Sequence, residues 1–138
     1  MTRIDSNTAP EPVGAYPHAR KVGSLLFLSG VGPRKKGTKD IPGVTLDVNG
    51  NIIAYDIEAQ CRSVFENVRV ILEDSGAQWT DLVDVTVFLT NMQDDFKKYN
   101  ELWKEYFGEY PPCRTTVEVN CLPTPIAIEL KCIANLGT

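Results

Sequence analysis

Short stretches of apolar and β-branched residues alternate with polar turns along the chain. Where apolar and polar residues alternate, the pattern is typical of a strand with one buried face. Gly23 separates the first two stretches, so these two predict a hairpin. The predicted strands cover residues 15–22, 24–29, 82–90, 115–119 and 126–134.

Between these strands, two segments repeat apolar residues at spacings of three and four, which predicts amphipathic helices. In the first, Asp56 can cap the N-terminus, and Gly76 can end the helix in a left-handed conformation. In the second, Asp94 or Asp95 can cap the N-terminus, and Pro111-Pro112 end the helix. The apolar faces consist of Ile57, Cys61, Val64, Phe65, Val68, Ile71 and Leu72, and of Phe96, Tyr99, Leu102, Trp103, Tyr106 and Phe107.

Three segments show no such periodicity. Residues 1–12 are polar and hold two prolines, which is typical of a loose lead-in. Residues 30–45 are rich in glycine, proline and lysine, and a loop of this length in a compact domain is usually functional or mobile. Asn49-Gly50, between two short apolar runs, predicts a tight turn because both residue types tolerate a positive φ.

The order strand, strand, helix, strand, helix, strand, strand predicts a single domain over residues 1–138 of the α+β class. Two helices packed on one face of a mixed sheet leave the other face of the sheet to be covered or hydrated. The last strand carries Ile126, Ile128, Leu130 and Ile133 on or near one face, with Ala127 and Cys132 between them. Apolar residues on both faces of that strand favour oligomerisation.

Composition excludes several classes of function. The net charge of −4, with no basic arm, argues against nucleic acid as the main partner. The apolar runs are too short to span a membrane, and no secretory signal is present, so we expect a cytoplasmic protein. The four cysteines form no CxxC pair and the chain has one histidine, so we expect no metal site and reduced, mostly buried cysteines.

The usual catalytic motifs are missing, which leaves arginine, carboxylates, hydroxyls and backbone groups as candidates. Arg114 begins a predicted strand, and its guanidinium can bind a carboxylate through two parallel hydrogen bonds. A structural ion pair is the more frequent role for such an arginine. Glu129 lies within an apolar strand, where burial would suit it to acid–base work. An outward position on an edge strand is the alternative for Glu129, and Glu118 is a rival for the same role.

Other candidates have weaker support. Tyr16 can line a pocket, whereas His18 fits a surface or packing role. Arg34 belongs to a basic loop, which is more often simply a solvated run of charge. Cys113 and Cys121 have no nearby base, which argues against nucleophilic roles. Asn100, Trp103 and Tyr106 fit capping or packing roles on the second helix.

The stretch RTTVEVNCLP from Arg114, followed by the strand IAIELKCIA, resembles the signature of the RidA/YjgF family of reactive-intermediate deaminases. That signature reads approximately R-x-x-V-x-V-x-x-L-P, followed by a strand with an I-E-[IL] core. The resemblance covers nearly the whole chain. Further matching pieces are Tyr16, Leu28-Ser29-Gly30, the Gln60–Asn67 helix motif, Val87-Phe88-Leu89, Phe96, Asn100 and Tyr106-Phe107.

This resemblance implies a chorismate-mutase-like α+β fold, a homotrimer with sites between subunits, and no cofactor or metal. It implies that Arg114 binds the substrate carboxylate and that Glu129 orients or activates water. It places Tyr16, Ser29 and Asn100 near the pocket. Backbone groups of Gly30 and Val31 are candidates for binding the nitrogen or the diene. Thr116 stands where many members of the family have cysteine.

Three departures from the common family pattern suggest a particular branch. Residues 14–19 read G-A-Y-P-H-A instead of G-P-Y-S-Q-A, Thr116 replaces the cysteine, and residues 32–43 form an extended loop. Together these features resemble 2-aminomuconate deaminases, which release ammonia from a dicarboxylate enamine to give 4-oxalocrotonate. Arg34 would then bind the second carboxylate.

The resemblance leaves other functions open. They are a housekeeping deaminase of 2-iminobutanoate and 2-iminopropanoate, a non-enzymatic trimeric binding protein, and a ribonuclease. Low basicity and the absence of a histidine pair argue against the ribonuclease.

Overall fold

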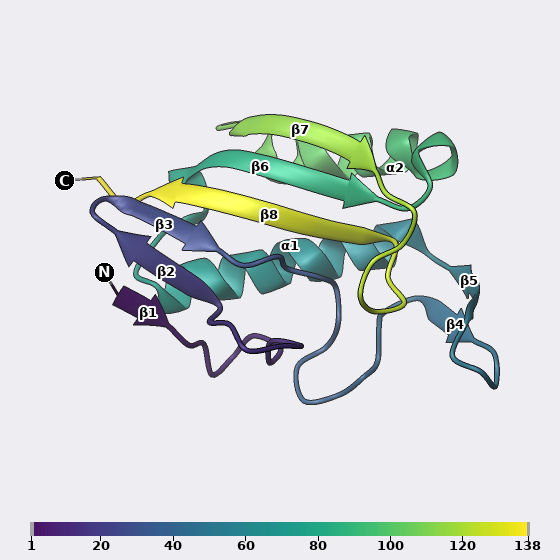
Figure 1. Ribbon diagram of the computed structural model, residues 1–138. Coiled ribbons are helices and arrows are strands. Elements are labelled where there is room, and N and C mark those ends of the chain that lie inside the picture. The colour runs from purple at the N-terminus through teal and green to yellow at the C-terminus, as the bar shows by residue number, and fades with distance from the viewer. Residues whose placement is uncertain (1, 138) are drawn as a thin grey trace.

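A six-stranded mixed sheet runs through the middle of the molecule (Figure 1). The computed structural model describes residues 2–137. Neighbouring strands are antiparallel, except that β6 and β7 are parallel. In spatial order the strands are β1 (Thr2–Ile4), β2 (Ala19–Val22), β3 (Leu25–Leu28), β8 (Ile128–Asn135), β6 (Leu82–Leu89) and β7 (Cys113–Glu118).

Two long helices, α1 (Ile57–Asp74) and α2 (Met92–Phe107), pack on the same face of this sheet (Figure 1). A short hairpin of β4 (Val44–Leu46) and β5 (Ile52–Tyr55) projects beyond the end of the sheet, and a 3-10 turn, η1 (Trp79–Asp81), precedes β6. The prediction of an α+β fold, with both helices on one face of a mixed sheet, is confirmed.

The core lies between the sheet and the helices. Every second residue of β8 faces the helices and is fully buried, beginning with Ile128. Because strand side chains alternate, Glu129, Lys131 and Ile133 lie on the face that no helix covers. The predicted grouping of Ile133 with Ile128 was therefore wrong. The helix-facing core of the sheet comprises Leu26, Leu28, Val85, Val87, Leu89, Ile128, Leu130, Cys132 and Ala134.

Three local predictions were wrong: the start of one strand, the residue that caps α2, and the form of one turn. The strand predicted from residue 15 is β2, which begins at Ala19. Helix α2 is capped by Asn91, whose Oδ1 accepts a hydrogen bond from the Asp94 N–H, so the cap is neither Asp94 nor Asp95. In the β4–β5 connection only Gly50 has a positive φ, of 83°, and the carbonyl of Asp47 accepts its N–H. This is a longer turn than the Asn-Gly pair predicts.

The N-terminal residues are not a loose lead-in. Thr2–Ile4 pair with β2 as an edge strand. Beyond them, the hydroxyls of Ser6 and Thr8 both donate to the carboxylate of Asp74 at the end of α1, with the Thr8 bond at 2.5 Å. We call residues 6–13 the N-terminal strap. These bonds fasten it to the helix layer, which composition alone did not indicate.

The four cysteines are free thiols, as expected, but only two are buried. Burial raises the pKa of Cys61 and of Cys132 to about 12. Cys113 and Cys121 are exposed, which corrects the expectation of mostly buried thiols. Separately, none of the helices in residues 2–137 is long and apolar enough to cross a membrane.

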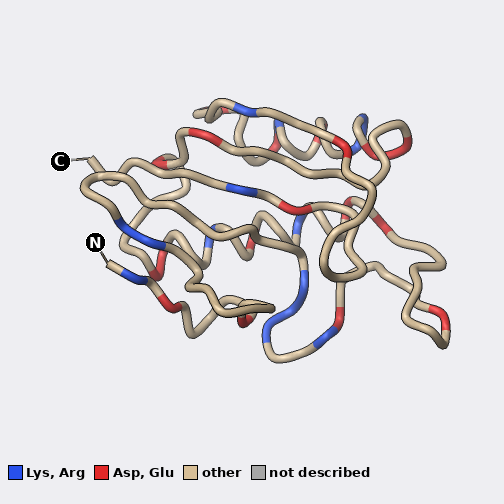
Figure 2. Tube along the Cα trace, in the orientation of Figure 1, with Lys and Arg blue, Asp and Glu red and all other residues tan. Residues whose placement is uncertain are grey.

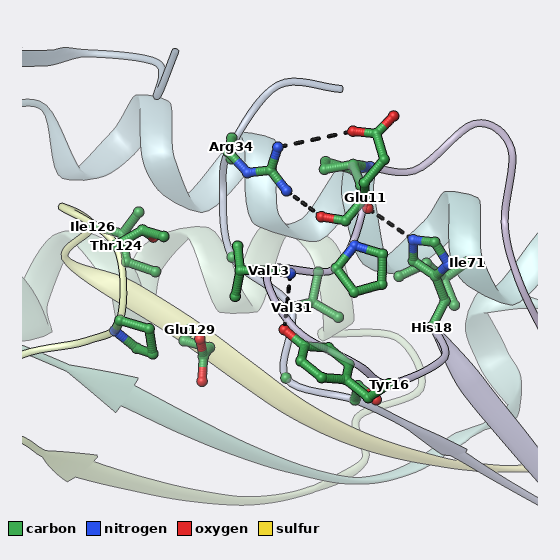
Figure 3. Close-up of a pocket in the computed structure, with 16 residues that line it drawn as sticks. Glu11, Val13, Tyr16, His18, Val31, Arg34, Ile71, Thr124, Ile126 and Glu129 are labelled. Atoms are coloured by element: carbon green, nitrogen blue, oxygen red, sulfur yellow. Dashed lines mark hydrogen bonds and ion pairs between the residues drawn. The ribbon is translucent and has the colours of Figure 1, made fainter. Parts of the chain in front are cut away.

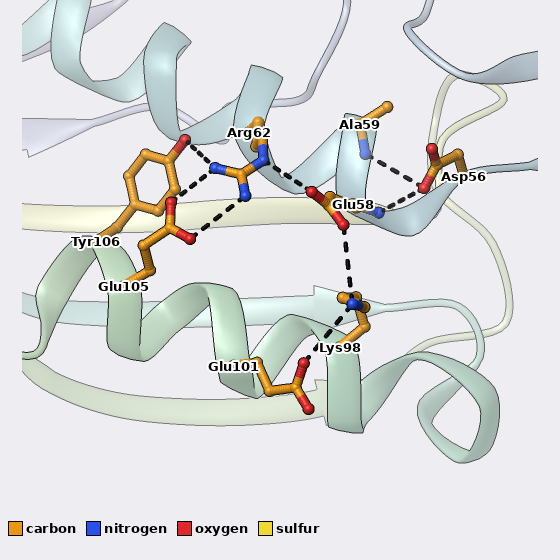
Figure 4. A network of polar contacts seen from close by, with 8 residues as sticks. All are labelled: Asp56, Glu58, Ala59, Arg62, Lys98, Glu101, Glu105 and Tyr106. Atoms are coloured by element: carbon orange, nitrogen blue, oxygen red, sulfur yellow. Dashed lines mark hydrogen bonds and ion pairs between the residues drawn. The ribbon is translucent and has the colours of Figure 1, made fainter.

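Ion pairs connect the outer surfaces of the two helices (Figure 4). The Arg62 guanidinium contacts Glu58 at 3.1 Å and Glu105 at 2.7 Å, and Lys98 lies 3.8 Å from Glu58. Arg62 holds the pKa of the Glu105 carboxyl below its usual range. Exposed pairs of this kind contribute little stability individually.

Candidate functional site

A cavity of about 200 Å³ opens between the N-terminal strap, the chain after β3 and the loop before β8 (Figure 3). Its lining is mixed: apolar groups come from Val13, Val31 and Ile126, and one free carboxylate comes from Glu129. Six of the residues that the sequence analysis proposed for the site line this cavity. They are Tyr16, Ser29, Gly30, Val31, Arg34 and Glu129.

Glu129 lies on β8, a central strand, so the edge-strand alternative is wrong. Its side chain is half-buried, and burial raises the pKa of its carboxyl. No hydrogen-bond or ion-pair partner within residues 2–137 occupies the carboxylate. A Cβ at Gly30 would lie 2.9 Å from Glu129 Oε2, so only glycine leaves room for this carboxylate against the backbone.

The chain around Gly30 contains one extra residue relative to β8. Phe27 pairs with Ile133, but Val31 pairs with Leu130, so four steps along one strand match three along the other. This is the count of a β-bulge, and bulges redirect side chains beside functional sites. The bulge turns Ser29 and Gly30 toward the cavity next to Glu129.

The polar groups beside the bulge are partly engaged. The Tyr16 hydroxyl accepts a hydrogen bond from the Val13 N–H at 3.2 Å and keeps its own proton for donation. The Ser29 hydroxyl donates to the Pro17 carbonyl at 2.7 Å. Both backbone groups of Val31 bond to Leu130, at 2.8 and 2.9 Å, so Val31 contributes its side chain to the cavity and no free backbone group.

Polar residues on α1 hold the cavity loops in place. Asn67 donates through Nδ2 to the carbonyls of Gly32 and Arg34, both at 2.9 Å, and the Ser63 hydroxyl donates to the Pro33 carbonyl at 2.7 Å. One turn earlier, Gln60 Oε1 accepts the Ala127 N–H at 2.8 Å. This anchoring role of Gln60, Ser63 and Asn67 was not predicted from the sequence. Their spacing of three and four residues, along one side of the apolar stripe of α1, is the signal that could have indicated it.

Arg34 lines the cavity but is not a free cation. Its guanidinium donates to the carbonyls of Glu11 and Thr38, the latter at 3.1 Å, and lies 3.9 Å from the Glu11 carboxylate (Figure 3). It therefore joins the basic loop to the N-terminal strap. Figure 2 shows the basic residues grouped along this loop. A second substrate carboxylate at Arg34 would compete with these contacts.

Arg114 lies apart from this cavity, on the edge strand β7 over helix α2. Its Nη1 donates to Asn100 Oδ1 at 2.9 Å. Its guanidinium carbon lies 5.2 Å from the ring centre of Tyr99 and 5.0 Å from that of Trp103. No carboxylate within residues 2–137 forms an ion pair with it. Within the described residues, the alternative of a structural ion pair is therefore wrong.

The residues around Arg114 are ordered by the second helix. The Tyr99 hydroxyl and the Thr116 hydroxyl share a hydrogen bond of 2.7 Å, and burial raises the pKa of Tyr99. Glu118 instead accepts the Met92 N–H at 2.8 Å, at the N-terminus of α2. This contact gives Glu118 a helix-capping role and removes it as a rival to Glu129.

Arg114 and Glu129 lie on opposite faces of the sheet. Arg114 is in register with Val85 of β6, which is buried beneath the helices. Glu129 is in register with Phe88, on the face without helices. Strand β6 also lies between their two strands. A single chain therefore presents two separate half-sites: a carboxylate half-site around Glu129 and a guanidinium half-site around Arg114.

Each half-site can perform one part of a reaction. A guanidinium that rests on aromatic rings and keeps free N–H groups can bind a planar carboxylate through two hydrogen bonds. A half-buried carboxyl whose pKa is raised by burial is suited to take up a proton and return it. Among residues 2–137, no group of three or more histidine, cysteine, aspartate or glutamate side chains is arranged to hold a metal ion.

A family model and relatives of known family each match nearly the whole chain. A family model described as "Endoribonuclease L-PSP" matches residues 6–136. A RutC family protein of Pyrococcus abyssi is 41% identical over 131 residues, which is 95% of this chain and 94% of the relative. The chloroplastic Reactive Intermediate Deaminase A of Arabidopsis thaliana is 34% identical over 133 residues, which is 96% of this chain and 65% of the relative.

Solved structures have the same fold. A Thermotoga maritima structure superposes with a TM-score of 0.85 at 33% identity, and covers 100% of this chain and 99% of the other. The Escherichia coli YjgF structure has a TM-score of 0.83 at 30% identity, with 98% of each chain covered. The E. coli TdcF structure with bound serine has a TM-score of 0.83 at 31% identity and covers 98% of each chain. The expected chorismate-mutase-like fold is thereby confirmed.

Proposed function

Because the chain belongs to the RidA/YjgF/L-PSP family, we propose that it is a hydrolytic deaminase of small enamine and imine carboxylic acids. The observation that supports this most is the state of Arg114. Its guanidinium is oriented by Asn100 and three aromatic rings, yet it has no carboxylate partner within residues 2–137. A cation held in this way is prepared for the carboxylate of a ligand.

The proposed site needs two copies of the chain. Arg114 and Glu129 lie on opposite faces, and the helix-free face of the sheet carries Phe27, Phe88 and Ile133. Packing that face against a second copy would bury these side chains and could place the guanidinium half-site of one subunit beside the carboxylate half-site of another. A closed ring of three copies satisfies this heterologous contact three times. The family resemblance implies three subunits, and together with this contact it leads us to propose a homotrimer with sites between subunits.

The proposed reaction adds water across a C–N double bond. The 2-amino enoic acid first moves a proton from nitrogen to carbon and becomes the 2-imino acid. Water then adds to the imine carbon, with one proton passing to nitrogen, and gives a carbinolamine. Loss of ammonia leaves the 2-oxo acid. Arg114 binds the carboxylate next to the reacting carbon, and Glu129 accepts a proton from water and returns it to the leaving nitrogen.

The finer identity of the substrate is also a proposal. The basic loop around Arg34 supports a dicarboxylate such as 2-aminomuconate, but the contacts of Arg34 with Glu11 and Thr38 weigh against a free second binding site. Short imines such as 2-iminobutanoate are the alternative, because they need no second carboxylate-binding group. TdcF, a relative of known structure, binds serine, which is a ligand of that size.

Turnover of matched substrates tests this proposal. We expect ammonia release from 2-iminobutanoate or 2-iminopropanoate generated in the assay, and we expect Arg114→Ala to abolish it. Turnover of 2-aminomuconate should be measured beside them, because a preference for it would place the chain in the dicarboxylate branch. Failure to accelerate any of these hydrolyses would contradict the deaminase proposal.

The family description also names an endoribonuclease, which makes RNA cleavage the control activity. The one histidine of the chain, His18, is buried and has both ring nitrogens engaged. A net charge of −4 gives no electrostatic attraction for RNA. We therefore expect no cleavage of RNA at the enzyme concentrations that give rapid deamination.

A further inference from the structure

Two hydroxyl groups meet beside the guanidinium of Arg114. The oxygens of Tyr99 and Thr116 lie 2.7 Å apart. Tyr99 belongs to the buried face of α2 and has no exposed surface, whereas Thr116 lies two residues beyond Arg114 on β7 and is partly exposed. Alternate residues of a strand share a face, so the side chains of Thr116 and Arg114 lie on the same side of β7. Both hydroxyls therefore belong to the guanidinium half-site.

Burial decides which of the two hydroxyls donates this hydrogen bond. Each hydroxyl has one hydrogen and can also accept. Among the described residues, the bond to Thr116 is the one that the Tyr99 hydroxyl can donate. If Thr116 donated instead, the hydrogen of Tyr99 would be buried without an acceptor, which is unfavourable. Burial also raises the pKa of Tyr99, so its hydroxyl keeps the hydrogen that it donates. Tyr99 is therefore the donor and Thr116 is the acceptor.

This direction of the bond leaves the hydrogen of Thr116 free. A hydroxyl oxygen carries its hydrogen and its lone pairs at separate positions, so accepting from Tyr99 turns the Thr116 hydrogen away from the buried ring. No other group in residues 2–137 forms a side-chain hydrogen bond with Thr116. The Arg114 guanidinium, which lies 5.2 Å from the centre of the same ring, has only donors and cannot accept this hydrogen. The half-site therefore presents a hydroxyl donor beside the guanidinium donors.

We propose that Tyr99 is a positioning residue, whose hydroxyl orients Thr116 as a further hydrogen-bond donor to the carboxylate that Arg114 binds. This role rests on the carboxylate-binding function proposed above. A carboxylate has about four acceptor positions, and two parallel bonds from a guanidinium use only part of them. A third donor can therefore bind the same carboxylate. Tyr99 itself touches no substrate and acts through Thr116.

Single substitutions separate the two hydroxyls from the side chains that carry them. Tyr99→Phe keeps the ring beneath the guanidinium and removes only the donor to Thr116. Thr116→Val keeps the branched shape and removes the hydroxyl, whereas Thr116→Ser keeps the hydroxyl. Tyr106→Phe is the matched control, because Tyr106 also lies on α2 but its hydroxyl accepts a hydrogen bond from Arg62 on the outer surface of the helices (Figure 4).

Kinetic constants for deamination test the proposal. The carboxylate is present in the substrate and in the transition state alike, so losing a donor to it should raise KM and leave kcat nearly unchanged. We expect KM to rise about tenfold in Thr116→Val. In Tyr99→Phe it should rise about threefold, because the hydroxyl remains but can occupy any of its staggered positions. The double variant should match Thr116→Val, whereas Thr116→Ser and Tyr106→Phe should match the wild type. A wild-type KM in Tyr99→Phe, or effects that multiply in the double variant, would overturn the proposal.

Calorimetric titration with 2-oxobutanoate separates this proposal from the deaminase function. This 2-oxo acid carries the carboxylate and binds without turnover. We expect Kd in the variants to rise by the same factors as KM, whether or not the protein hydrolyses an imine. Turnover that is absent while these factors hold would contradict the deaminase function alone. Equal Kd values for the wild type, Tyr99→Phe and Thr116→Val would overturn the role of the hydroxyls, and a wild type that binds no 2-oxobutanoate would overturn the carboxylate-binding half-site together with this proposal. Mere misfolding would lower the amount of ligand bound and leave Kd unchanged.

Discussion

Arg114 is oriented by uncharged neighbours, and this decides how its substitution should behave. One amide oxygen and the faces of three rings orient the guanidinium, and no carboxylate neutralises it within the described chain. The sequence alone favoured an ion pair, because strand-end arginines usually find one. Only the family signature reversed that preference, and only the coordinates show the rings beneath the side chain.

Arg114→Lys should separate catalysis from stability. Lysine keeps the charge but loses the paired N–H groups, each worth roughly 1.5–3 kcal/mol toward a charged partner. We expect kcat/KM to fall by about ten- to a hundredfold. The melting temperature should stay nearly constant, because no ion pair within the chain is broken. Arg69→Lys, in an exposed ion pair on α1, is the matched control and should keep full activity. Unchanged kcat/KM in Arg114→Lys would exclude this arginine from the mechanism.

Gly30→Ala probes the opposite half-site. The added methyl group would lie 2.9 Å from Glu129 Oε2, so the carboxylate must move away from the bulge. Because that carboxylate is the end of a flexible side chain, folding should be little affected while kcat falls. Gly32→Ala is the comparison, since its methyl group meets only the Ile126 side chain, at 3.1 Å. Equal losses in the two variants would show that crowding, and not the displacement of Glu129, is responsible.

At the scale of elements, the hydrophobic pattern was a good guide to helices and central strands. The stripe on α1 predicted its cap at Asp56 and its end near Gly76, and both are observed. The pattern failed where polar side chains decide the structure. Asn91 caps α2 and Asp74 anchors the strap, but side-chain partners of this kind cannot be read from periodicity.

A partly buried hydrogen bond joins Tyr55 of the β4–β5 hairpin to Asp95 of α2, and it makes a pH prediction possible. The Tyr55 hydroxyl donates to Asp95 Oδ2 at 2.6 Å, and burial raises the pKa of Asp95. A carboxyl whose pKa is higher in the folded state stabilises the fold less as pH rises through that pKa. Asp95→Asn keeps an acceptor for Tyr55 and has no such titration.

The stability difference between Asp95→Asn and the wild type should therefore move in favour of the variant from acidic to neutral pH. Urea unfolding at several pH values measures this difference directly. The comparison between the two proteins cancels the many carboxyls that titrate alike in both. A difference that moves in favour of the wild type as pH rises would mean that the Tyr55 bond outweighs the desolvation of Asp95.

At the scale of the whole molecule, the two faces of the sheet determine what one chain can do. The sequence placed Arg114 and Glu129 in neighbouring stretches and, through the family resemblance, in one site. Strand register shows that one chain holds them apart, on opposite faces. No pattern within a single sequence reports how copies of a chain meet, so the assembly remains a prediction. Light scattering should give the mass of three chains, and a monomer would contradict the shared site.

Mixing two inactive variants tests the central claim most directly. Arg114→Ala and Glu129→Gln are each expected to abolish turnover, because each removes one half of every site. If the variants are unfolded together and refolded as mixed trimers, about a quarter of the sites should combine an intact Arg114 from one chain with an intact Glu129 from another. The account predicts recovery of about that fraction of wild-type activity, with neither variant active alone. Mixed oligomers that stay as inactive as their parents would contradict a site shared between subunits.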